Sequence, residues 1–200
     1  LHPSDREFML GGTQDNGTLL RRSDASWLRV DGGDGGHSLI DQNAGDTTSV
    51  VMYHTYFNQT TAMAFARVTT TANANDGGWS AFGCGFSGVI ANGLLCNATA
   101  ILFYAPLVRG PGTPNTIYFG SDRLYRSADL GVTMPAVSQV LIAGQAITTI
   151  AVSPANDNVR LVGLRNGRLF AVTSAVGAFV DVTAPTMPAP NPLDPSLRRP

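Results

Sequence analysis

The chain has no lysine, few charged residues and no long hydrophobic run. All 13 basic residues are arginine, charged residues make up 14% of the 200 residues, and the formal net charge is −1. This balance provides no basic surface for nucleic acid or for an anionic membrane. No run approaches the roughly 18 consecutive apolar residues of a membrane-spanning helix. We therefore expect neither nucleic acid nor a membrane among the partners.

Cysteine is also scarce, with only Cys84 and Cys96, each close to glycine. Two thiols cannot fill the four positions of a structural zinc site, and the three histidines lack finger spacing. We expect no metal and no cofactor. The two cysteines either form one local disulfide, which would indicate an oxidising compartment, or remain free thiols. The sequence leaves both alternatives open.

Glycine, proline and apolar residues are abundant. The chain contains 22 Gly, 12 Pro and 44% hydrophobic residues, which suits a turn-rich globular protein with a sizeable core. No segment shows a sustained helical period bounded by caps, so we expect an all-β fold with essentially no helix. The uninterrupted apolar runs 139–142 and 146–152 predict inner strands buried on both faces.

A motif that ends in arginine recurs along the chain. It ends at Arg22, Arg67 and Arg126, and a copy without arginine ends at Ala171, so the intervals are 45, 59 and 45 residues. A period near 45 fits a four-stranded antiparallel propeller blade. The longer interval contains the glycine-rich stretch between the cysteines. The hairpin signals Asn16-Gly17 and Asn166-Gly167 predict turns with positive φ at both positions.

We therefore expect one partial β-propeller domain over residues 1–200, with about four blades. The predicted units are 1–38, 39–98, 99–145 and 146–184, and residues 185–200 resemble the start of a further blade. Propellers close with four to eight blades. Both ends look cut, so we expect a fragment whose partners include the remaining blades of the parent protein.

The segment 127–133 predicts a tight polar turn. The side chains of Ser127 and Asp129 can bond backbone N–H groups, and Gly131 supplies a positive φ. The pattern S-x-D-x-G-x-T resembles the Asp-box of BNR-repeat propellers, although Met134 stands where that family usually has tryptophan. Shortened copies end at Trp27 and Trp79. The resemblance gives all of these residues a structural role.

A second pattern, G-T-Q-D-N-G-T followed by W-x-x-V-x-G-G-D-G-G, covers residues 12–18 and 27–36. It resembles glycosyl-hydrolase-like Asp-box propellers, a superfamily that includes xyloglucanase-type and sortilin-type proteins. The resemblance implies a glycan-associated domain with polysaccharide or glycoprotein as partner. It also implies an extracellular or periplasmic location.

Successive turns of a blade alternate between the two faces of a propeller, which predicts a ligand-binding rim. Loops on a rigid scaffold are where binding sites usually lie. The rim residues expected from this alternation are Gln14, Asp15, Asn16, Asp31, Asp34, His37, Asp122, Arg123, Arg165 and Asn166. The glycines around Asp34 allow either close approach of a ligand or a tight entry into the next strand.

The chemistry of the rim has two interpretations. Glycoside hydrolysis normally uses two carboxyl groups about 5–10 Å apart, and Asp15 and Asp34 are the catalytic candidates. The arginines do not assemble into the triad of a sialidase. The alternative is a non-catalytic protein-binding or assembly scaffold, as in sortilin-like or photosystem-assembly-like propellers. Whether the protein is an enzyme stays open.

Overall fold

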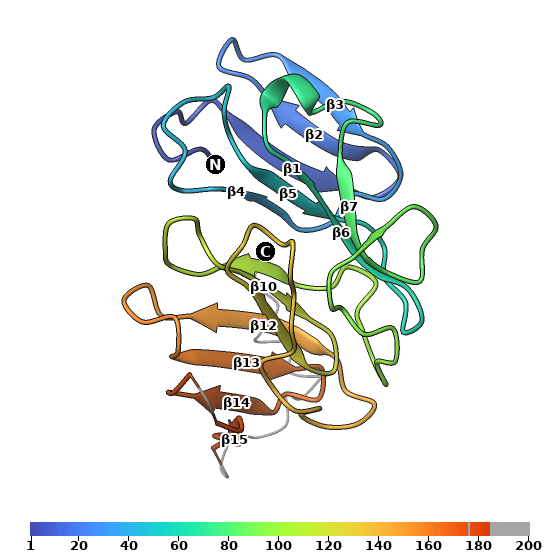
Figure 1. Cartoon of the computed structure of the whole chain (residues 1–200), viewed down its shortest axis with the longest axis vertical. Coiled ribbons are helices and arrows are strands. Elements are labelled where there is room, and N and C mark those ends of the chain that lie inside the picture. The colour runs from blue at the N-terminus through green and yellow to red at the C-terminus, as the bar shows by residue number, and fades with distance from the viewer. Residues whose placement is uncertain (176, 185–200) are drawn as a thin grey trace, which may run out of the picture.

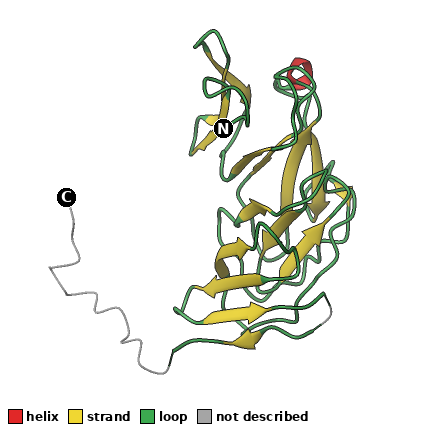
Figure 2. Ribbon diagram, turned by 90° about the vertical axis from the view of Figure 1, so that its left-hand side faces the viewer, coloured by secondary structure: helices red, strands yellow, loops and turns green. Residues whose placement is uncertain are grey.

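The computed structural model describes residues 1–175 and 177–184. Four β-sheets follow one another along the long axis of the molecule, from the sheet of β1–β3 at one end to the sheet of β12–β15 at the other (Figures 1 and 2). The described residues contain a single short helical turn, η1 (Thr71–Asn73), of the 3₁₀ type. None of them forms a helix with the length and apolarity needed to cross a membrane.

The first two sheets are built from the N-terminal half of the chain. Sheet 1 has the order β1 (Met9–Thr13), β2 (Gly17–Arg21), β3 (Trp27–Asp31). Sheet 2 has the order β4 (Ser38–Ile40), β5 (Met52–Thr55), β6 (Met63–Val68), β7 (Ser80–Cys84), β8 (Ile90–Ala91). All pairs are antiparallel except β7 with the short β8, which is parallel.

The last two sheets are built from the C-terminal half. Sheet 3 contains β9 (Leu107–Arg109), β10 (Ile117–Gly120) and β11 (Leu124–Ser127). A single bridge between Tyr125 and Ala136 continues it outward. Sheet 4 contains β12 (Ile147–Val152), β13 (Arg160–Leu164), β14 (Leu169–Val172) and β15 (Val180–Asp181), in that order. Chain order therefore equals spatial order in sheet 4, as in a propeller blade.

Three clusters of buried side chains fill the spaces between consecutive sheets. Phe8 and Met52 belong to the cluster between sheets 1 and 2, Phe65 and Phe119 to the cluster between sheets 2 and 3, and Leu124 and Val162 to the cluster between sheets 3 and 4. Burying such a side chain stabilises the fold by about 1.5–3 kcal/mol. Packing of four successive sheets of three to five strands makes the chain an all-β, partial β-propeller.

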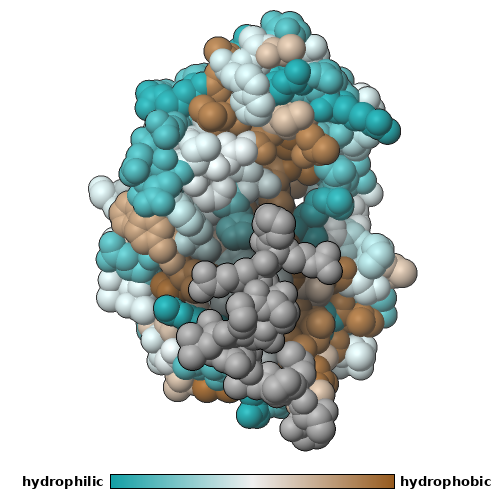
Figure 3. Space-filling model, turned by 180° about the vertical axis from the view of Figure 1, so that it is seen from behind, coloured by the Kyte–Doolittle hydropathy of each residue, from teal (hydrophilic) through white to brown (hydrophobic). Residues whose placement is uncertain are grey.

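Some apolar surface remains open in this arc. In the view from behind, hydrophobic residues gather toward the middle of the face and hydrophilic residues along its upper flanks (Figure 3). Trp27 at 54% and Val180 at 64% are among the most exposed large apolar side chains. Exposed apolar surface of this kind is where further protein or ligand can pack.

The turn 127–133 has the expected local structure. The hydroxyl of Ser127 accepts the N–H of Gly131 at 2.8 Å, and the carboxylate of Asp129 accepts the N–H of Thr133 at 2.9 Å. Gly131 has φ = +85°. The side chain of Met134 is fully buried, so it fills core space at the end of the turn.

Two strand predictions were wrong. Residues 139–142 are not a strand but part of the connection from sheet 3 to sheet 4, where Leu141 donates its N–H to the carbonyl of Asp122. The run 146–152 does form β12, yet Thr148, Thr149 and Ala151 are exposed. A register shift after Ile147 changes the alternation of side chains. The expected burial on both faces is therefore absent.

The two hairpin turns exist, but their backbone conformations differ from the prediction. In the first turn Asp15 (φ = +64°) and Gly17 (φ = +81°) are left-handed, and in the second Gly167 (φ = +84°) is. Neither Asn16 nor Asn166 has positive φ. Both turns are thus longer than the two-residue type, with glycine at the position that returns into the strand.

Candidate functional site

The β1–β2 turn and the loop after β3 meet at one edge of sheet 1. The backbone N–H of Asp15 donates to Oδ1 of Asp34 at 3.0 Å, and the N–H of Gly35 donates to the carbonyl of Thr13 at 3.0 Å. The N–H of Gly36 donates to Thr55 in sheet 2 at 2.9 Å. The structure therefore brings the backbone of Asp15 into contact with the carboxylate of Asp34, the second of the two acids that the sequence singled out.

Close backbone packing accounts for two glycines of this loop. A Cβ on Gly35 would lie 2.3 Å from the carbonyl oxygen of Gly17, and one on Gly36 would lie 2.4 Å from Oγ1 of Thr55. No larger residue fits at either position. Gly33 differs, because a Cβ there meets nothing within 4 Å and its φ is +74°. Gly35 and Gly36 are thus required by close packing at the entry into the next strand, whereas the space beside Gly33, next to Asp34, is open.

A largely apolar cavity of about 290 Å³ lies on one side of Asp34. The side chains that line it come from the loop after β3, from β5–β7 and from the segment after Cys84. They are Asp34, Tyr56, Phe57, Ala64, Ala81, Phe86, Ser87 and Val89, together with Gly32 and Gly33. We call this the aromatic cavity. Its volume suits one ring-sized group, and cavities of this kind are typical ligand sites.

A second, more polar cavity of about 320 Å³ lies on the other side of the same loop. It is lined by Gly12, Gln14, Gly35, Gly36, His37 and Tyr104, and we call it the polar cavity. Partial burial lowers the pKa of His37, so its imidazole is neutral at pH 7. Burial, followed by the charges of Asp34 and Asp15, raises the pKa of Tyr104. The Tyr104 hydroxyl is therefore protonated at pH 7.

A row of four aromatic rings connects the two cavities. Phe86 contacts Phe57 edge-on with ring centres 5.4 Å apart, Phe57 stacks on Phe103 at 5.6 Å, and Phe103 contacts Tyr104 at 4.9 Å. Phe103 is 49% exposed. The hydroxyl oxygen of Tyr104 is buried and has no hydrogen-bond partner among the described residues. Sequence reasoning missed this aromatic row; its one signal was phenylalanine in turn-rich segments outside the predicted strands.

Asp31 lies beneath the rim and holds sheets 1 and 2 together. Its Oδ2 atom accepts the hydroxyl of Tyr56 at 2.6 Å and lies 2.9 Å from Nε2 of His54, and its Oδ1 accepts the N–H of Gly32. Burial opposes ionisation, but the hydrogen bonds from His54 and Tyr56 outweigh it and lower the pKa of Asp31. This carboxylate positions Tyr56 in the wall of the aromatic cavity.

Trp79 supports the same junction. Its indole N–H donates to the carbonyl of Val30 at 2.9 Å, and its ring contacts His54 edge-on at 4.5 Å. It therefore links β3 of sheet 1 to sheet 2. Trp27, which the sequence placed in an equivalent role, is 54% exposed and has no such contact among the described residues.

Asp122 does not lie open on a rim, contrary to the expectation. Its side chain is fully buried. It accepts the N–H of Thr99 at 2.7 Å, the hydroxyls of Thr99 and Ser121, and Nε of Arg123 at 3.0 Å. Burial is outweighed by the bonds from Arg123 and Thr99, which lower the pKa of Asp122. Asp122 and Arg123 thus form an ion pair whose carboxylate is fully buried.

Arg165 and Asn166 are exposed at the β13–β14 turn, at the far end of the arc from sheet 1 (Figure 1). Asn166 accepts the N–H of Arg168 within its own turn. The side chain of Asn16 also bonds within its own turn, where it donates to the carbonyl of Gln14. The residues that the structure brings together are thus Gln14, Asp15, Asp34 and His37, with Tyr104 as an addition.

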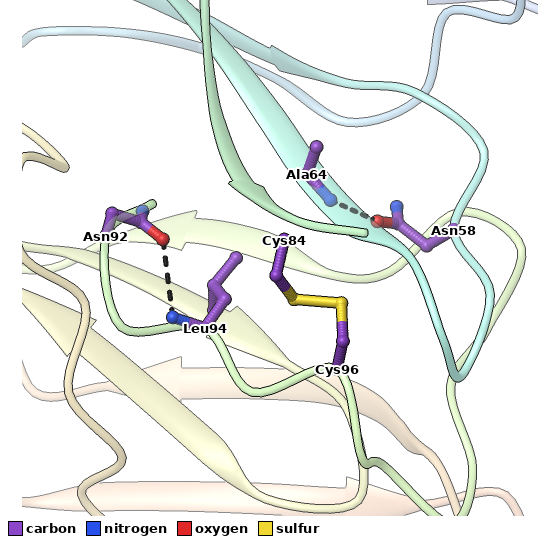
Figure 4. The surroundings of a disulfide bond; sticks show 6 residues. All are labelled: Asn58, Ala64, Cys84, Asn92, Leu94 and Cys96. Carbon is purple, nitrogen blue, oxygen red and sulfur yellow. Dashed lines mark hydrogen bonds between the residues drawn. A yellow bond between two sulfur atoms is a disulfide. The ribbon is translucent and has the colours of Figure 1, made fainter. Parts of the chain in front are cut away.

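Cys84 and Cys96 are bonded, with their Cα atoms 5.8 Å apart. The bond closes the segment that follows β7 and carries Phe86, Ser87 and Val89 (Figure 4). Nearby, Asn58 accepts the N–H of Ala64 at 2.8 Å and Asn92 accepts the N–H of Leu94. The disulfide therefore anchors one wall of the aromatic cavity, and the alternative of two free thiols does not hold.

Two of the acidic residues predicted for the rim do not suit acid catalysis. A general acid for glycoside cleavage needs a pKa raised toward neutrality. Asp31 and Asp122 have lowered pKa values, so neither suits that role. Asp34 lines the aromatic cavity, and Asp15 lies next to it with its N–H bonded to the Asp34 carboxylate. Among the described residues, no three His, Cys, Asp or Glu side chains gather as metal ligands.

Comparison with known proteins supports the fold. No protein-family model matches the chain, and no curated protein does. Among solved structures, the chain is similar to the GH74 xyloglucanase from Xanthomonas campestris, with a TM-score of 0.61 and 12% sequence identity. The match covers 92% of this chain and 29% of the xyloglucanase chain. At this identity the likeness shows the fold alone, a partial propeller that spans less than a third of its structural neighbour.

Proposed function

We propose that the chain is part of an extracellular or periplasmic glycan-binding propeller of hydrolase-like ancestry. The observation that carries this proposal is that the loop around Asp34 borders two cavities, which a row of aromatic rings connects. An extended chain of sugar rings can lay its apolar C–H faces along aromatic rings while its hydroxyls bond polar side chains. Gln14, Asp34 and Tyr104 supply such groups here.

Three further points support the proposal. The structural neighbour is itself named a xyloglucanase. The Cys84–Cys96 disulfide suits an oxidising compartment. Local sequence features resemble Asp-box propellers, and the side chains of Ser127 and Asp129 accept backbone N–H groups within their own turn. Hydrolysis, where it occurs, would use Asp15 and Asp34.

Binding of soluble oligosaccharides to the purified chain tests the proposal. Titration calorimetry with a panel of β-linked oligomers should give binding that falls at least about fivefold in Phe103→Ala, because stacking on an aromatic ring contributes about 1 kcal/mol or more. Val132→Ala is the matched control, since Val132 is also 49% exposed but lies on the turn after β11. Absence of binding to every oligomer would refute the proposal.

The competing scaffold function is favoured by the largely apolar lining of the aromatic cavity, which would also accept a hydrophobic side chain of a protein partner. Reducing-end assays on the same oligomers, with Asp34→Asn and Asp15→Asn as comparisons, separate hydrolysis from binding alone. Product release that either variant abolishes identifies an enzyme. Binding of oligomers without product identifies a non-catalytic glycan receptor.

A further inference from the structure

The carboxylates of the rim lack positive partners. Asp34 accepts one backbone N–H, from Asp15, and neither residue takes part in an ion pair within the described part of the chain. The ion pairs of the molecule involve other acids. Asp15 is exposed and Asp34 is partly exposed, so both remain available to a ligand.

Neighbouring basic groups do not neutralise this charge. Arg29 reaches toward Gly32, but its guanidinium is paired with Asp76 at 2.6 Å. His37 borders the polar cavity, and partial burial lowers its pKa, so the ring is neutral at pH 7. The charge of the rim is therefore negative, which disfavours acidic ligands and favours cationic ones.

The aromatic walls add to this preference. Phe57 and Phe86 line the aromatic cavity beside Asp34, and the electron-rich face of an aromatic ring attracts an ammonium group. Tyr56 is held in the same wall by its bond to Asp31. A ligand that combines a ring with a primary ammonium would use the cavity volume, the ring faces and the carboxylates together.

We propose that this rim selects glycans built from 2-amino sugars over neutral and acidic glycans. The inference rests on the proposed glycan-binding function and names its ligand class. The sugar ring lies against the Phe57–Phe103 stack, and its ammonium group faces Asp34 and Asp15. Tyr104, whose buried hydroxyl has no hydrogen-bond partner among the described residues, lines the adjoining polar cavity. Arg29 is already paired with Asp76, so it does not offer uronic and sialic acids a free guanidinium for their carboxylates.

The test compares three β-1,4-linked oligomers of equal length that differ only at carbon 2. Glucosamine, N-acetylglucosamine and glucose oligomers carry an ammonium, an acetamide and a hydroxyl at that position. At about pH 6, where such an amine is protonated, we expect the glucosamine oligomer to bind at least about tenfold more tightly than the other two. One ion pair together with one cation–π contact accounts for a difference of this size.

Variants identify the groups responsible. Asp34→Asn keeps an acceptor for the N–H of Asp15 but removes the charge, so the preference for the glucosamine oligomer should fall to about threefold or less. Asp24→Asn removes the same charge from an exposed turn at the other end of β2–β3 and should leave the preference unchanged. Equal loss in both variants would show attraction to net charge alone and overturn the inference.

The outcomes separate this inference from the proposed function. Equal affinity for the glucose and glucosamine oligomers overturns the amino-sugar preference and leaves glycan binding intact. Failure of all three oligomers to bind overturns both. Oligolysine that binds as tightly as the glucosamine oligomer, with the same sensitivity to Asp34→Asn, shows that the rim recognises the ammonium group without the sugar and overturns the choice of a glycan.

Discussion

The hydroxyl of Tyr56 donates a 2.6 Å hydrogen bond to Oδ2 of Asp31, which joins sheet 2 to the last residue of β3 in sheet 1. The same oxygen lies 2.9 Å from Nε2 of the fully buried His54. The carboxylate of Asp31 thus joins sheets 1 and 2 and orients the ring of Tyr56, which lines the aromatic cavity. Asp31 therefore contributes both to the stability of the fold and to the shape of the aromatic cavity.

Replacement of Asp31 should destabilise the fold in a pH-dependent way. Asp31→Asn should lower the free energy of unfolding by about 1–3 kcal/mol at pH 7. The pKa of Asp31 is lowered from its ordinary value of 3.8, so the contribution of the charge is present above that value and is lost as pH falls through the folded-state pKa. Urea unfolding at pH 7 and at about pH 3 should show the difference between variant and wild type shrinking.

Tyr56→Phe is the comparison for this experiment. It removes one donor and leaves His54 beside the carboxylate, so the loss should be smaller, about 1 kcal/mol. A difference between Asp31→Asn and wild type that stays the same at both pH values would contradict the role given to the charge.

Two glycines with similar backbone angles should respond differently to alanine. Gly131 has φ = +85°, and a Cβ there would lie 2.7 Å from the ring of the buried Phe65. Gly144 has φ = +76° and nothing within 4 Å of its Cβ position. Gly144→Ala should cost about 1 kcal/mol from the backbone alone, whereas Gly131→Ala should cost at least about 2 kcal/mol. Thermal unfolding measures both, and equal losses would show that the ring moves aside freely.

The sequence predicted the architecture because repeats carry local signals. The 127–133 turn specifies its own hydrogen bonds through Ser127 and Asp129, whatever surrounds it. Recurrence of such turns is enough to indicate an all-β repeat fold. The run 139–142 misled because apolar residues also line a connection packed against the core between sheets 3 and 4.

The site was harder to predict because it depends on contacts between distant segments. The alternation of turns placed Asp15 and Asp34 on one rim, and the N–H of Asp15 does donate to the carboxylate of Asp34. Asp122 looked identical as a loop carboxylate, yet Thr99, 23 residues away, buries it in hydrogen bonds. The rings of Phe57, Phe86 and Phe103 come from three separate loops, and nothing in their local sequence indicates that they meet.

Loss of the disulfide should weaken both the fold and the aromatic cavity. The Cys84→Ser/Cys96→Ser double variant frees a segment that the bond closes across 12 residues, which should lower stability by about 3 kcal/mol. Ligand affinity should fall as well, because Phe86 and Val89 lie on this segment. Wild-type protein treated with reductant should match the double variant in thermal unfolding. An unchanged melting temperature in reductant would contradict the bond's role.

Asp34 and Asp122 should separate function from stability. Asp122→Ala leaves the N–H of Thr99 and the Arg123 guanidinium without their buried partner, and should cost about 3 kcal/mol of stability. Asp34→Ala removes one bond to a partly exposed N–H, and should cost less than about 1 kcal/mol. Its effect should fall on glycan affinity instead. Asp122→Ala should therefore lower stability more than glycan affinity, and Asp34→Ala should lower glycan affinity more than stability. A large loss of stability in Asp34→Ala would instead make Asp34 a structural residue, because its carboxylate would then be needed to hold the β1–β2 turn against the loop after β3.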